Sequence, residues 1–236
     1  MIEYIAETRS TNADLIGRVR ASEPLPEGHW LVADRQVAGR GRQGRQWFDG
    51  TGNFMGSTLV RLGACDPPAA TLALLTGLAV YELCALLCPA DVKLSLKWPN
   101  DVMVERAKLS GILLETVGDT VVVGIGVNLV QAPALPDRTT AALADCGVAP
   151  DRGQFAEALA DRLARELERW RTYGAEAILR RWSAAAHPVG TPLSVHDANA
   201  RPQSGKFDGL AQDGSLLLRF ADGSTRAIHA GDILLD

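Results

Sequence analysis

Residues 39–47, GRGRQGRQW, carry the side chains best suited to hold an anion. Glycine allows backbone N–H groups to approach a phosphate closely, and arginine offers paired donors that match phosphate or carboxylate oxygens. The segment ends at Trp47, on which a flat ligand could stack. Taken alone, a Gly/Arg run of this kind is better explained as a solvated basic loop. Its three arginines are Arg40, Arg42 and Arg45.

Two further segments could bind a ligand that carries negative charge. Lys108, which opens the KLSG run of residues 108–111, would stabilise charge that develops at a phosphorus centre, and Gly111 would let a ligand approach the backbone. Gly124 and Gly126 alternate along an apolar strand, so they would leave a slot on one face. A solvated hairpin lysine and tight packing beneath a helix are the respective alternatives.

Polar side chains stand out at three other places. Ser10-Thr11-Asn12 precedes a predicted helix, and KWPND occupies residues 97–101. Asp101 could accept a proton or pair with an arginine, and a structural ion pair with Lys97, at the other end of this segment, is the alternative. Asn128, which ends the GIGVN run, could bind the edge of a base, although in isolation a turn cap explains it better.

The composition is that of a globular chain of 236 residues, 47% of them hydrophobic, with a formal net charge of -4. This charge argues against a broad attraction to nucleic acid, so the arginine cluster is local. The N-terminal residues include acids and no apolar run, which argues against a signal peptide and predicts a cytoplasmic protein. No histidine completes a metal-ligand spacing with the four cysteines, which we expect to be buried thiols.

Residues 69–88 are apolar enough to raise the possibility of a membrane span. Glu82 would cost about 2.5 kcal/mol or more near the centre of a bilayer. Thr71, Thr76 and Gly77 reduce the hydrophobicity further. We therefore expect a helix that is buried in a globular core.

The candidate functional segments fall at the ends of predicted elements. Residues 2–7 predict a strand, and the Thr11–Asp14 sequence matches a capping box that begins a helix. Strands at 30–34 and 53–62 flank the Gly/Arg loop, which should join neighbouring strands at one edge of a sheet.

The middle of the chain predicts an antiparallel meander followed by helices. Its strands cover residues 92–98, 101–105, 110–117 and 120–129, with a break at Pro99 and a turn at Gly118-Asp119. A shorter helix through Ile178 and Trp182 should follow the clearest amphipathic helix, and both should cover one sheet face. That clearest helix spans residues 151–173, with Phe155, Leu159, Leu163, Leu167 and Trp170 on one stripe.

Beyond Pro188 the sequence changes to short strand-like pieces separated by turn signals. Asp208-Gly209, Asp213-Gly214 and Asp222-Gly223 each predict a hairpin turn. We therefore expect a small β-barrel of about 50 residues at the end of the chain.

In their order along the chain these motifs resemble those of the biotin protein ligases. They are S-T-N, Q-x-A-GRGRxGRxW, KWPND, KLSG and GIGVN, of which GRGRxGR and KWPND are the specific ones. The resemblance spans nearly the whole chain. It implies an α+β fold: residues 1–187 would form a class II synthetase-like catalytic domain with a mixed, largely antiparallel sheet covered by helices, and residues 188–236 a small SH3-like β-barrel. No helix-turn-helix segment precedes the catalytic motifs, which implies the monofunctional form that does not bind DNA.

The family activates biotin with ATP and Mg²⁺ to give biotinyl-5'-AMP, and transfers biotin to a lysine of a biotin carboxyl carrier domain in a carboxylase. The resemblance implies catalytic roles for Lys108, Arg42, Arg45 and Asp101. It implies biotin contacts from Ser10, Thr11, Asn12, Gln36, Gly39, Arg40, Arg42, Lys108, Gly111, Gly124 and Gly126. It implies ATP contacts from Arg40, Arg42, Arg45, Trp47, Asn100, Lys108 and Asn128, with Mg²⁺ carried mainly by ATP.

The resemblance also implies which part of the ligand each of these residues contacts. The ureido ring of biotin would be hydrogen-bonded by Ser10, Thr11 and Gln36, and its slot would be formed by Gly111, Gly124 and Gly126. Lys108 would bridge the reacting groups electrostatically, and Trp47 would hold the adenine together with Asn128. Asp101 would orient or deprotonate the incoming lysine. The Gly/Arg loop would be ordered by the bound adenylate.

Three alternatives remain open at this point. A lipoate or octanoate ligase or transferase shares the fold but should not carry GRGRxGR with KWPND. A nucleic-acid-binding module could use the arginine loop on phosphates and Trp47 on bases. A protein that only binds the ligand is the third. We also expect a possible homodimer through an exposed sheet edge.

Overall fold

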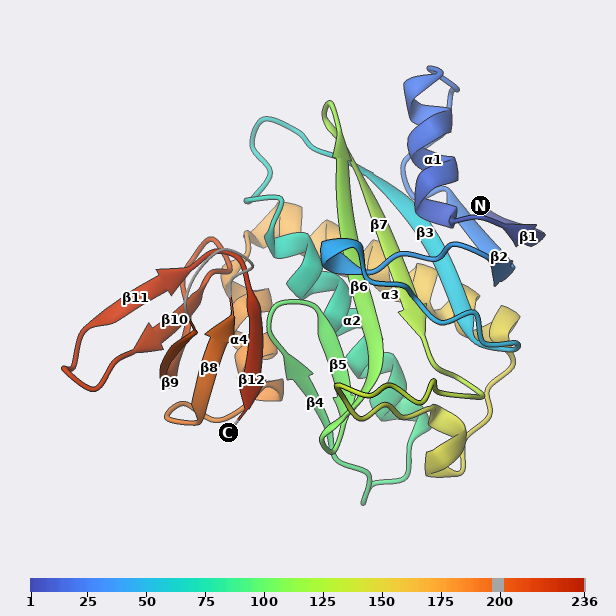
Figure 1. Ribbon diagram of the computed structural model, residues 1–236. Coiled ribbons are helices and arrows are strands. Elements are labelled where there is room, and N and C mark those ends of the chain that lie inside the picture. Colours follow the sequence, from blue (N-terminus) through green and yellow to red (C-terminus); the bar gives the residue numbers. More distant parts are fainter. Residues whose placement is uncertain (197–201, 236) are drawn as a thin grey trace.

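The computed structural model describes residues 1–196 and 202–235 (Figure 1). Within these residues the strands form a seven-stranded and a five-stranded sheet. The larger sheet has the order β1-β2-β3-β7-β6-β5-β4, in which β1 and β2 are parallel and the other neighbours antiparallel. This confirms the predicted α+β class and the largely antiparallel sheet. The strands are β1 (Ile2–Thr8), β2 (Trp30–Gln36), β3 (Phe54–Arg61), β4 (Leu94–Lys97), β5 (Asp101–Val104), β6 (Ala107–Val117) and β7 (Thr120–Val127).

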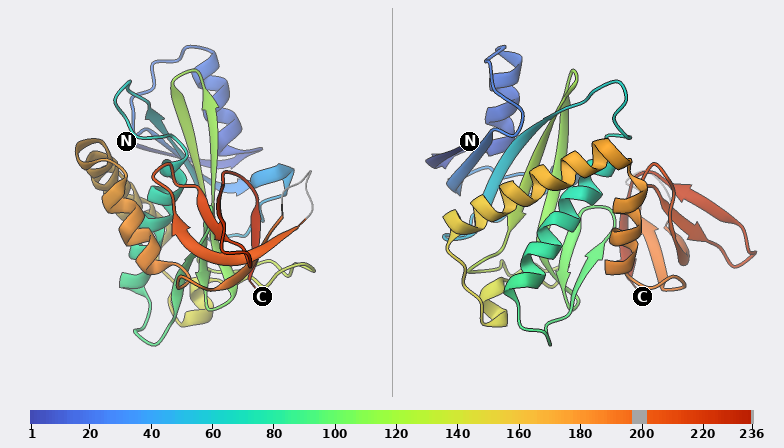
Figure 2. Two further views of the ribbon diagram at one scale, coloured as in Figure 1. Left: turned by 90° about the vertical axis from the view of Figure 1, so that its left-hand side faces the viewer. Right: turned by 180° about the vertical axis from the view of Figure 1, so that it is seen from behind.

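The two faces of the large sheet carry separate hydrophobic cores. Because side chains alternate along a strand, Leu31, Leu59 and Val122 face α1 (Thr11–Arg20) and pack with Leu15. Their neighbours belong to a larger core beneath α2 (Thr71–Leu87), α3 (Arg152–Tyr173) and α4 (Glu176–Ala185). Figure 2 shows these three helices together on the face opposite α1.

The helix predictions hold with one shift. The cap of α1 is Ser10, whose hydroxyl accepts a hydrogen bond from the N–H of Ala13 at 3.4 Å. The predicted cap, Thr11, is the first helical residue, because the extended backbone at Ser10 already points its oxygen at the first turn. On α3, the predicted stripe is buried except for Leu167, which is partly buried.

The buried helix predicted within residues 69–88 is α2, and Glu82 on it pairs with Arg162 and Arg181 from the neighbouring helices. Among the residues described, no helix is long and apolar enough to cross a membrane. The cysteine prediction is correct for Cys84, which is buried, and wrong for Cys65, which is exposed in the loop between β3 and α2. Cys88 and Cys146 are only partly buried.

The Gly/Arg loop joins neighbouring strands, as predicted, since it connects β2 and β3. Both strands lie inside the sheet, not at its lateral edge, so the loop leaves from the strand ends. It contains a short turn of 3-10 helix, η1 (Arg42–Gly44). Backbone bonds from Gly41 N–H to the Arg45 carbonyl (2.7 Å) and from Trp47 N–H to the Gly39 carbonyl (2.9 Å) close it into a hairpin.

The C-terminal strands pair antiparallel in the order β11-β10-β9-β8-β12 and lie beside the end of the large sheet that β4 and β5 form (Figure 1). In the described part of this sheet, β11 and β12 are unpaired edges, so the barrel closure that we predicted is not seen there. The boundary predicted at residues 187/188 falls between α4 and β8 and stays a prediction. The strands are β8 (Pro192–His196), β9 (Gln203–Leu210), β10 (Leu216–Arg219), β11 (Thr225–Ile228) and β12 (Asp232–Leu235).

One of the three hairpin predictions in this sheet is wrong. Asp208-Gly209 lies inside β9, where Gly209 has φ +101°. Leu216 pairs with Leu210 and Leu218 pairs with Phe207, so β9 carries one extra residue and forms a β-bulge there. The other two Asp-Gly pairs form the turns on either side of β10.

Candidate active site

A cavity of about 690 Å³ opens on the sheet face that carries α1, beyond the N-terminal end of that helix. Residues from six strands, the Gly/Arg loop and the segment after β7 surround it. Every residue that the sequence predicts for the site lines it: Ser10, Thr11, Asn12, Gln36, Gly39, Arg40, Arg42, Arg45, Trp47, Asn100, Asp101, Lys108, Gly111, Gly124, Gly126 and Asn128. The fold therefore gathers these residues in one place, and their individual roles remain predictions.

One end of the cavity is a buried polar recess at the start of α1. The backbone N–H of Thr11 donates to Gln36 Oε1 at 2.7 Å. The Thr11 hydroxyl lies 2.7 Å from Ser57 Oγ, and Ser57 Oγ donates to Asn12 Oδ1 at 2.6 Å. These side chains are all less than a tenth exposed. They form a fixed set of donors and acceptors on the cavity wall.

The floor of the cavity is made of glycines in β6 and β7. A Cβ at Gly126 would stand 2.6 Å from Nε1 of Trp47 and closer to two of its ring carbons, and a Cβ at Gly111 would lie 3.1 Å from the same ring. The indole of Trp47 therefore packs on this floor, inside the slot predicted for biotin, so the ring would have to shift when biotin binds there. A Cβ at Gly124 would lie 2.9 Å from Asn12 Cγ. Side chains at these three positions would fill the slot.

Lys108 faces this floor because of a β-bulge in β6. Val102 pairs with Ser110 and Met103 pairs with Lys108, so Leu109 is an extra residue. The bulge shifts the alternation of side chains by one. Lys108 and Gly111, three residues apart, consequently face the cavity together, and Lys108 Nζ lies 3.1 Å from the position of a Cβ at Gly111.

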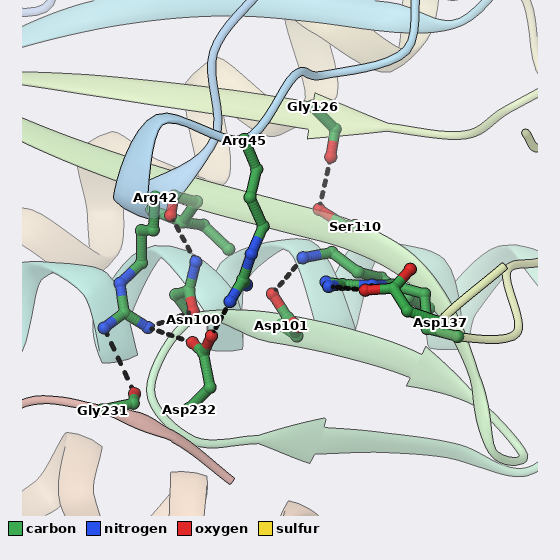
Figure 3. A network of polar contacts seen from close by, with 12 residues as sticks. Arg42, Arg45, Asn100, Asp101, Ser110, Gly126, Asp137, Gly231 and Asp232 are labelled. Carbon is green, nitrogen blue, oxygen red and sulfur yellow. Dashed lines mark hydrogen bonds and ion pairs between the residues drawn. The ribbon is translucent and has the colours of Figure 1, made fainter. Parts of the chain in front are cut away.

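Lys108 donates a hydrogen bond from Nζ to Asp101 Oδ1 at 2.6 Å, and Figure 3 labels this aspartate. The same Nζ lies 5.9 Å from the centre of the Trp47 ring. Both members of the ion pair are largely buried, with side chains 19% and 16% exposed. Asp101 thus pairs with Lys108, and not with Lys97 as the structural alternative supposed. The pair holds one cation and one carboxylate at the middle of the cavity.

Two arginines of the loop reach across the cavity to the C-terminal sheet (Figure 3). Arg42 donates to Asn100 Oδ1 at 3.1 Å, to the carbonyl of Gly231 at 3.2 Å and to Asp232 Oδ1 at 3.4 Å. Arg45 forms an ion pair with Asp232. Since Asp232 begins β12, the C-terminal sheet supplies an acidic partner for the cationic loop.

The two asparagines of the site are held by backbone groups. Asn100 donates from Nδ2 to the carbonyl of Ile112 at 2.7 Å and so keeps its oxygen towards Arg42. Asn128 donates from Nδ2 to the carbonyl of Ala141 at 3.1 Å. Its Oδ1 is buried and has no hydrogen-bond partner in the described part of the chain. Asn128 thus lines the cavity and carries a buried acceptor that no described group uses.

Lys97 lies behind the Asp101–Lys108 pair, and burial lowers the pKa of its ammonium group, with Asp101 and Asp232 opposing that shift. The segment after α4 runs beside it, because Ala186 pairs with Leu96. His187 follows, and burial, then the charge of Lys97, lower the pKa of its imidazole. Among the described residues, its Nε2 is buried without a partner.

Acid should therefore destabilise the protein through His187. Because the folded pKa is below the ordinary value of about 6.5, the unfolded chain binds a proton more readily, and the stability contributed by neutral His187 is lost as the pH falls below about 6.5. We expect His187→Gln to lose less unfolding free energy between pH 7.5 and pH 5.5 than the parent protein does in urea titrations. A partly exposed histidine on β8, His196→Gln, is the control, and equal losses in the His187 variant and the parent would contradict the assignment.

Several lining residues escaped the sequence analysis. Ser57 is one polar side chain among the apolar residues of β3, and the small run Gly56-Ser57 was a signal that the strand approaches something closely. Asp232 lies far along the chain on the second sheet, and no local pattern connects it with Arg42. Glu115, on β6, is not a lining residue but accepts a hydrogen bond from the lining residue Asn12, whose Nδ2 lies 2.8 Å away. Asp137 and Arg138 also line the cavity.

Comparison with known proteins gives this fold and site a family. The model described as the biotin/lipoate A/B protein ligase family matches residues 4–129, and the model for the biotin protein ligase C terminal domain matches residues 197–236. The chain belongs to the biotin/lipoate A/B protein ligase family.

Sequence similarity to known relatives extends over nearly the whole chain. It is 36% identical to a biotin--[acetyl-CoA-carboxylase] ligase of Paracoccus denitrificans, covering 91% of this chain and 92% of that protein. It is 34% identical to the ligase of the same description from Mycobacterium tuberculosis, covering 99% and 88%. The fold matches a solved biotin protein ligase from Aquifex aeolicus, in complex with biotin and ATP, with a TM-score of 0.86 and 27% identity over 100% of this chain and 98% of that one.

Proposed function

We propose that this protein is a biotin protein ligase, which activates biotin with ATP to biotinyl-5'-AMP and transfers the biotinyl group to one lysine of a biotin carboxyl carrier domain. The observation that carries the proposal is the division of a single cavity into a polar recess, a glycine floor and a cationic end. These three parts fit, in order, the ureido ring, the thiophane ring with its acyl chain, and the carboxylate with the phosphates.

The polar recess suits a ureido group because it presents both kinds of hydrogen-bonding partner. Gln36 Oε1 is occupied by the Thr11 N–H, so the amide of Gln36 offers Nε2 to a ligand carbonyl. Thr11 Oγ1 offers lone pairs to a ligand N–H. The dithiolane of lipoate has no group that could use either partner, which favours biotin over the lipoate alternative.

In the first step a carboxylate oxygen of biotin attacks the α-phosphorus of ATP, the bond to the β-phosphate oxygen breaks, and pyrophosphate leaves. The two anions repel each other before they react. Lys108 lies between the glycine floor and the loop arginines, where it would neutralise both reactants and the charge of the transition state. Arg42 and Arg45 would exchange Asp232 for phosphate oxygens.

In the second step the lysine amine of the carrier attacks the acyl carbon, the bond to the phosphate oxygen breaks, and AMP leaves. Asp101 would accept a proton from, or orient, that amine, because its carboxylate lies at the middle of the cavity beside Lys108. The free Oδ1 of Asn128 would accept a hydrogen bond from the amino group of adenine. Trp47, which packs on the glycine floor, would contribute to the same closed site.

Mg²⁺ would enter with the phosphates of ATP. In residues 1–196 and 202–235 no group of three or more His, Cys, Asp and Glu side chains is arranged to hold a metal. Two carboxylates that line the cavity, those of Asp101 and Asp232, are already paired with Lys108 and with the loop arginines, respectively. We also propose a cytoplasmic location, which is supported by the acidic residues and the lack of an apolar run at the N-terminus.

Pyrophosphate exchange into ATP tests the activation step and its substrate. We expect exchange that depends on biotin and is absent with lipoate or octanoate. Exchange with lipoate alone would instead support the lipoate ligase alternative. Salt-sensitive binding of an oligonucleotide without any biotin-dependent exchange would support the nucleic-acid-binding alternative.

The Gly/Arg loop should become protected when the adenylate forms. Trypsin cleaves after Arg40, Arg42 and Arg45, and we expect cleavage at residues 39–47 to slow by at least about tenfold when biotin and ATP are both present, because phosphates would hold the arginines in the cavity. Cleavage after Lys93, which is exposed outside the cavity, is the internal control. Equal rates at the loop with and without ligands would contradict this expectation.

A further inference from the structure

A chain of side-chain hydrogen bonds crosses the polar recess and ends at a carboxylate. Glu115 on β6 accepts from Asn12 Nδ2 at 2.8 Å. Asn12 Oδ1 accepts from Ser57 Oγ at 2.6 Å, and Ser57 Oγ lies 2.7 Å from Thr11 Oγ1. The four residues come from α1, β3 and β6, so three elements that are far apart in sequence meet in one chain of contacts.

The carboxylate fixes the direction of every bond in this chain. An ionised carboxylate only accepts hydrogen bonds, so Asn12 must turn its Nδ2 towards Glu115 and its Oδ1 towards Ser57. The amide oxygen of Asn12 also only accepts, so Ser57 must give it the single hydroxyl proton that it has. The short contact between Ser57 and Thr11 then needs the proton of Thr11.

Thr11 consequently shows lone pairs, and no proton, to the cavity. Its other oxygen neighbour, Gln36 Oε1, lies farther away at 3.1 Å and already receives the Thr11 N–H at 2.7 Å, so the Thr11 proton goes to Ser57. Gln36 presents a donor instead, because its Oε1 receives the Thr11 N–H and its Nε2, which lies near Gly39, is left for a ligand. One acceptor and one donor therefore stand side by side.

We propose that Glu115 is a positioning residue for biotin: through Asn12 and Ser57, its carboxylate holds Thr11 as an acceptor for a ureido N–H. This rests on the proposed function, in which Thr11 and Gln36 bind the ureido group. Glu115 touches no substrate in this account. It makes the recess selective for a ligand that carries an N–H next to a carbonyl.

Gly124 keeps the middle of the chain in place. A Cβ there would stand 2.9 Å from Asn12 Cγ, so the amide of Asn12 lies flat against the strand between Ser57 and Glu115. Gly124 is thus needed for this chain of hydrogen bonds as well as for the slot.

Three residue types at position 115 test the direction of the chain. Glutamate only accepts, glutamine can do either, and lysine only donates, so Glu115→Lys would reverse Asn12 and Ser57 and turn the Ser57 proton towards Thr11. We expect the Kd for biotin, measured calorimetrically on the full chain without ATP, to rise about threefold for Glu115→Gln and at least about tenfold for Glu115→Lys. Biotin methyl ester, which lacks the negative charge, should follow the same order.

Ser57→Ala distinguishes the proposed role of Glu115, which acts through Ser57, from a merely structural role. Without the Ser57 hydroxyl the chain is cut, so both substitutions at position 115 should change the Kd less than about twofold in that background, and the double variants should bind more tightly than the corresponding single ones. The midpoint of thermal unfolding is measured for every variant to check that it folds. If Glu115→Lys does not fold, the comparison of Glu115→Gln with and without Ser57→Ala is sufficient for the test. Glu168→Gln on the exposed side of α3, whose carboxylate has no partner among the described residues, is the matched control.

Wild-type affinity in the Glu115 variants, or equal losses with and without Ser57, would overturn the proposal. Failure of the wild-type protein to bind biotin would instead overturn the proposed function. The two failures are therefore distinguishable in the same set of titrations.

Discussion

Lys108→Ala is expected to lower the rate of biotin-dependent pyrophosphate exchange by about a thousandfold at saturating substrates. Removing one preorganised electrostatic group from a water-poor site typically costs a factor of about 100 to 1000, and Lys108 would act on two anions at once. Its position supports this size of effect, because the β-bulge at Leu109 aims it at the glycine floor and Asp101 holds it there at 2.6 Å.

The matched control is Lys93→Ala, since Lys93 is exposed just before β4 and lies outside the cavity. That variant should exchange pyrophosphate at the parent rate. Thermal unfolding of the Lys108 variant checks that loss of the ion pair with Asp101 has not unfolded the sheet. Exchange within about threefold of the parent by a folded Lys108→Ala protein would remove Lys108 from the mechanism.

Gly126→Ala should produce the second large effect, on biotin affinity. The new Cβ would stand 2.6 Å from Nε1 of Trp47 and closer still to two ring carbons, so the indole would have to leave the glycine floor. Since β7 is an interior strand between β3 and β6, its backbone has little freedom to move away. We expect the Kd for biotin to rise by about a hundredfold, because the methyl group occupies space on the glycine floor that the ligand would need.

A glycine in open surroundings serves as the control, because it shows whether a glycine-to-alanine substitution lowers biotin affinity wherever it is made. Gly17 on α1 has no heavy atom within 4 Å of an added Cβ, so Gly17→Ala should bind biotin as the parent does and be slightly more stable. Calorimetric titration of both variants supplies the comparison. Parent-like biotin affinity in Gly126→Ala would show that the glycine floor is not where biotin lies.

Short motifs predicted residues that line one cavity, because each motif carries its own local chemistry. Gly124 and Gly126 alternate on one strand, so their common face follows from the period of two, and the structure places both on the cavity floor. The Gly/Arg loop, bounded by two apolar strands, was predictable for the same reason. The hairpin at Gly118-Asp119 likewise follows from the turn residues alone.

The parts that sequence analysis missed depend on contacts between distant segments. The alternation of side chains would put Lys108 and Gly111 on opposite faces, and only the pairing of β6 with β5 reveals the bulge that brings them together. In the second sheet, the same effect turned a predicted hairpin at Asp208-Gly209 into a bulge. The partnership of Asp232 with the loop arginines crosses between sheets, which no periodic pattern records.

The polar recess belongs to the same class of feature. Ser57 and Glu115 look like ordinary strand residues until α1 is docked, because only then does Asn12 lie between them. Local signals therefore located the groups that would meet substrate. The groups that orient them became visible only in the folded chain.

Transfer of biotin to a carrier tests the central claim most directly. The protein is incubated with biotin, ATP, Mg²⁺ and a biotin carboxyl carrier domain, and the carrier is analysed by mass spectrometry. We predict a mass increase of one biotinyl group on a single lysine, which requires both ATP and biotin and is lost with Lys108→Ala. An unmodified carrier under these conditions, together with a lipoyl adduct on a lipoyl carrier domain when lipoate replaces biotin, would contradict the account.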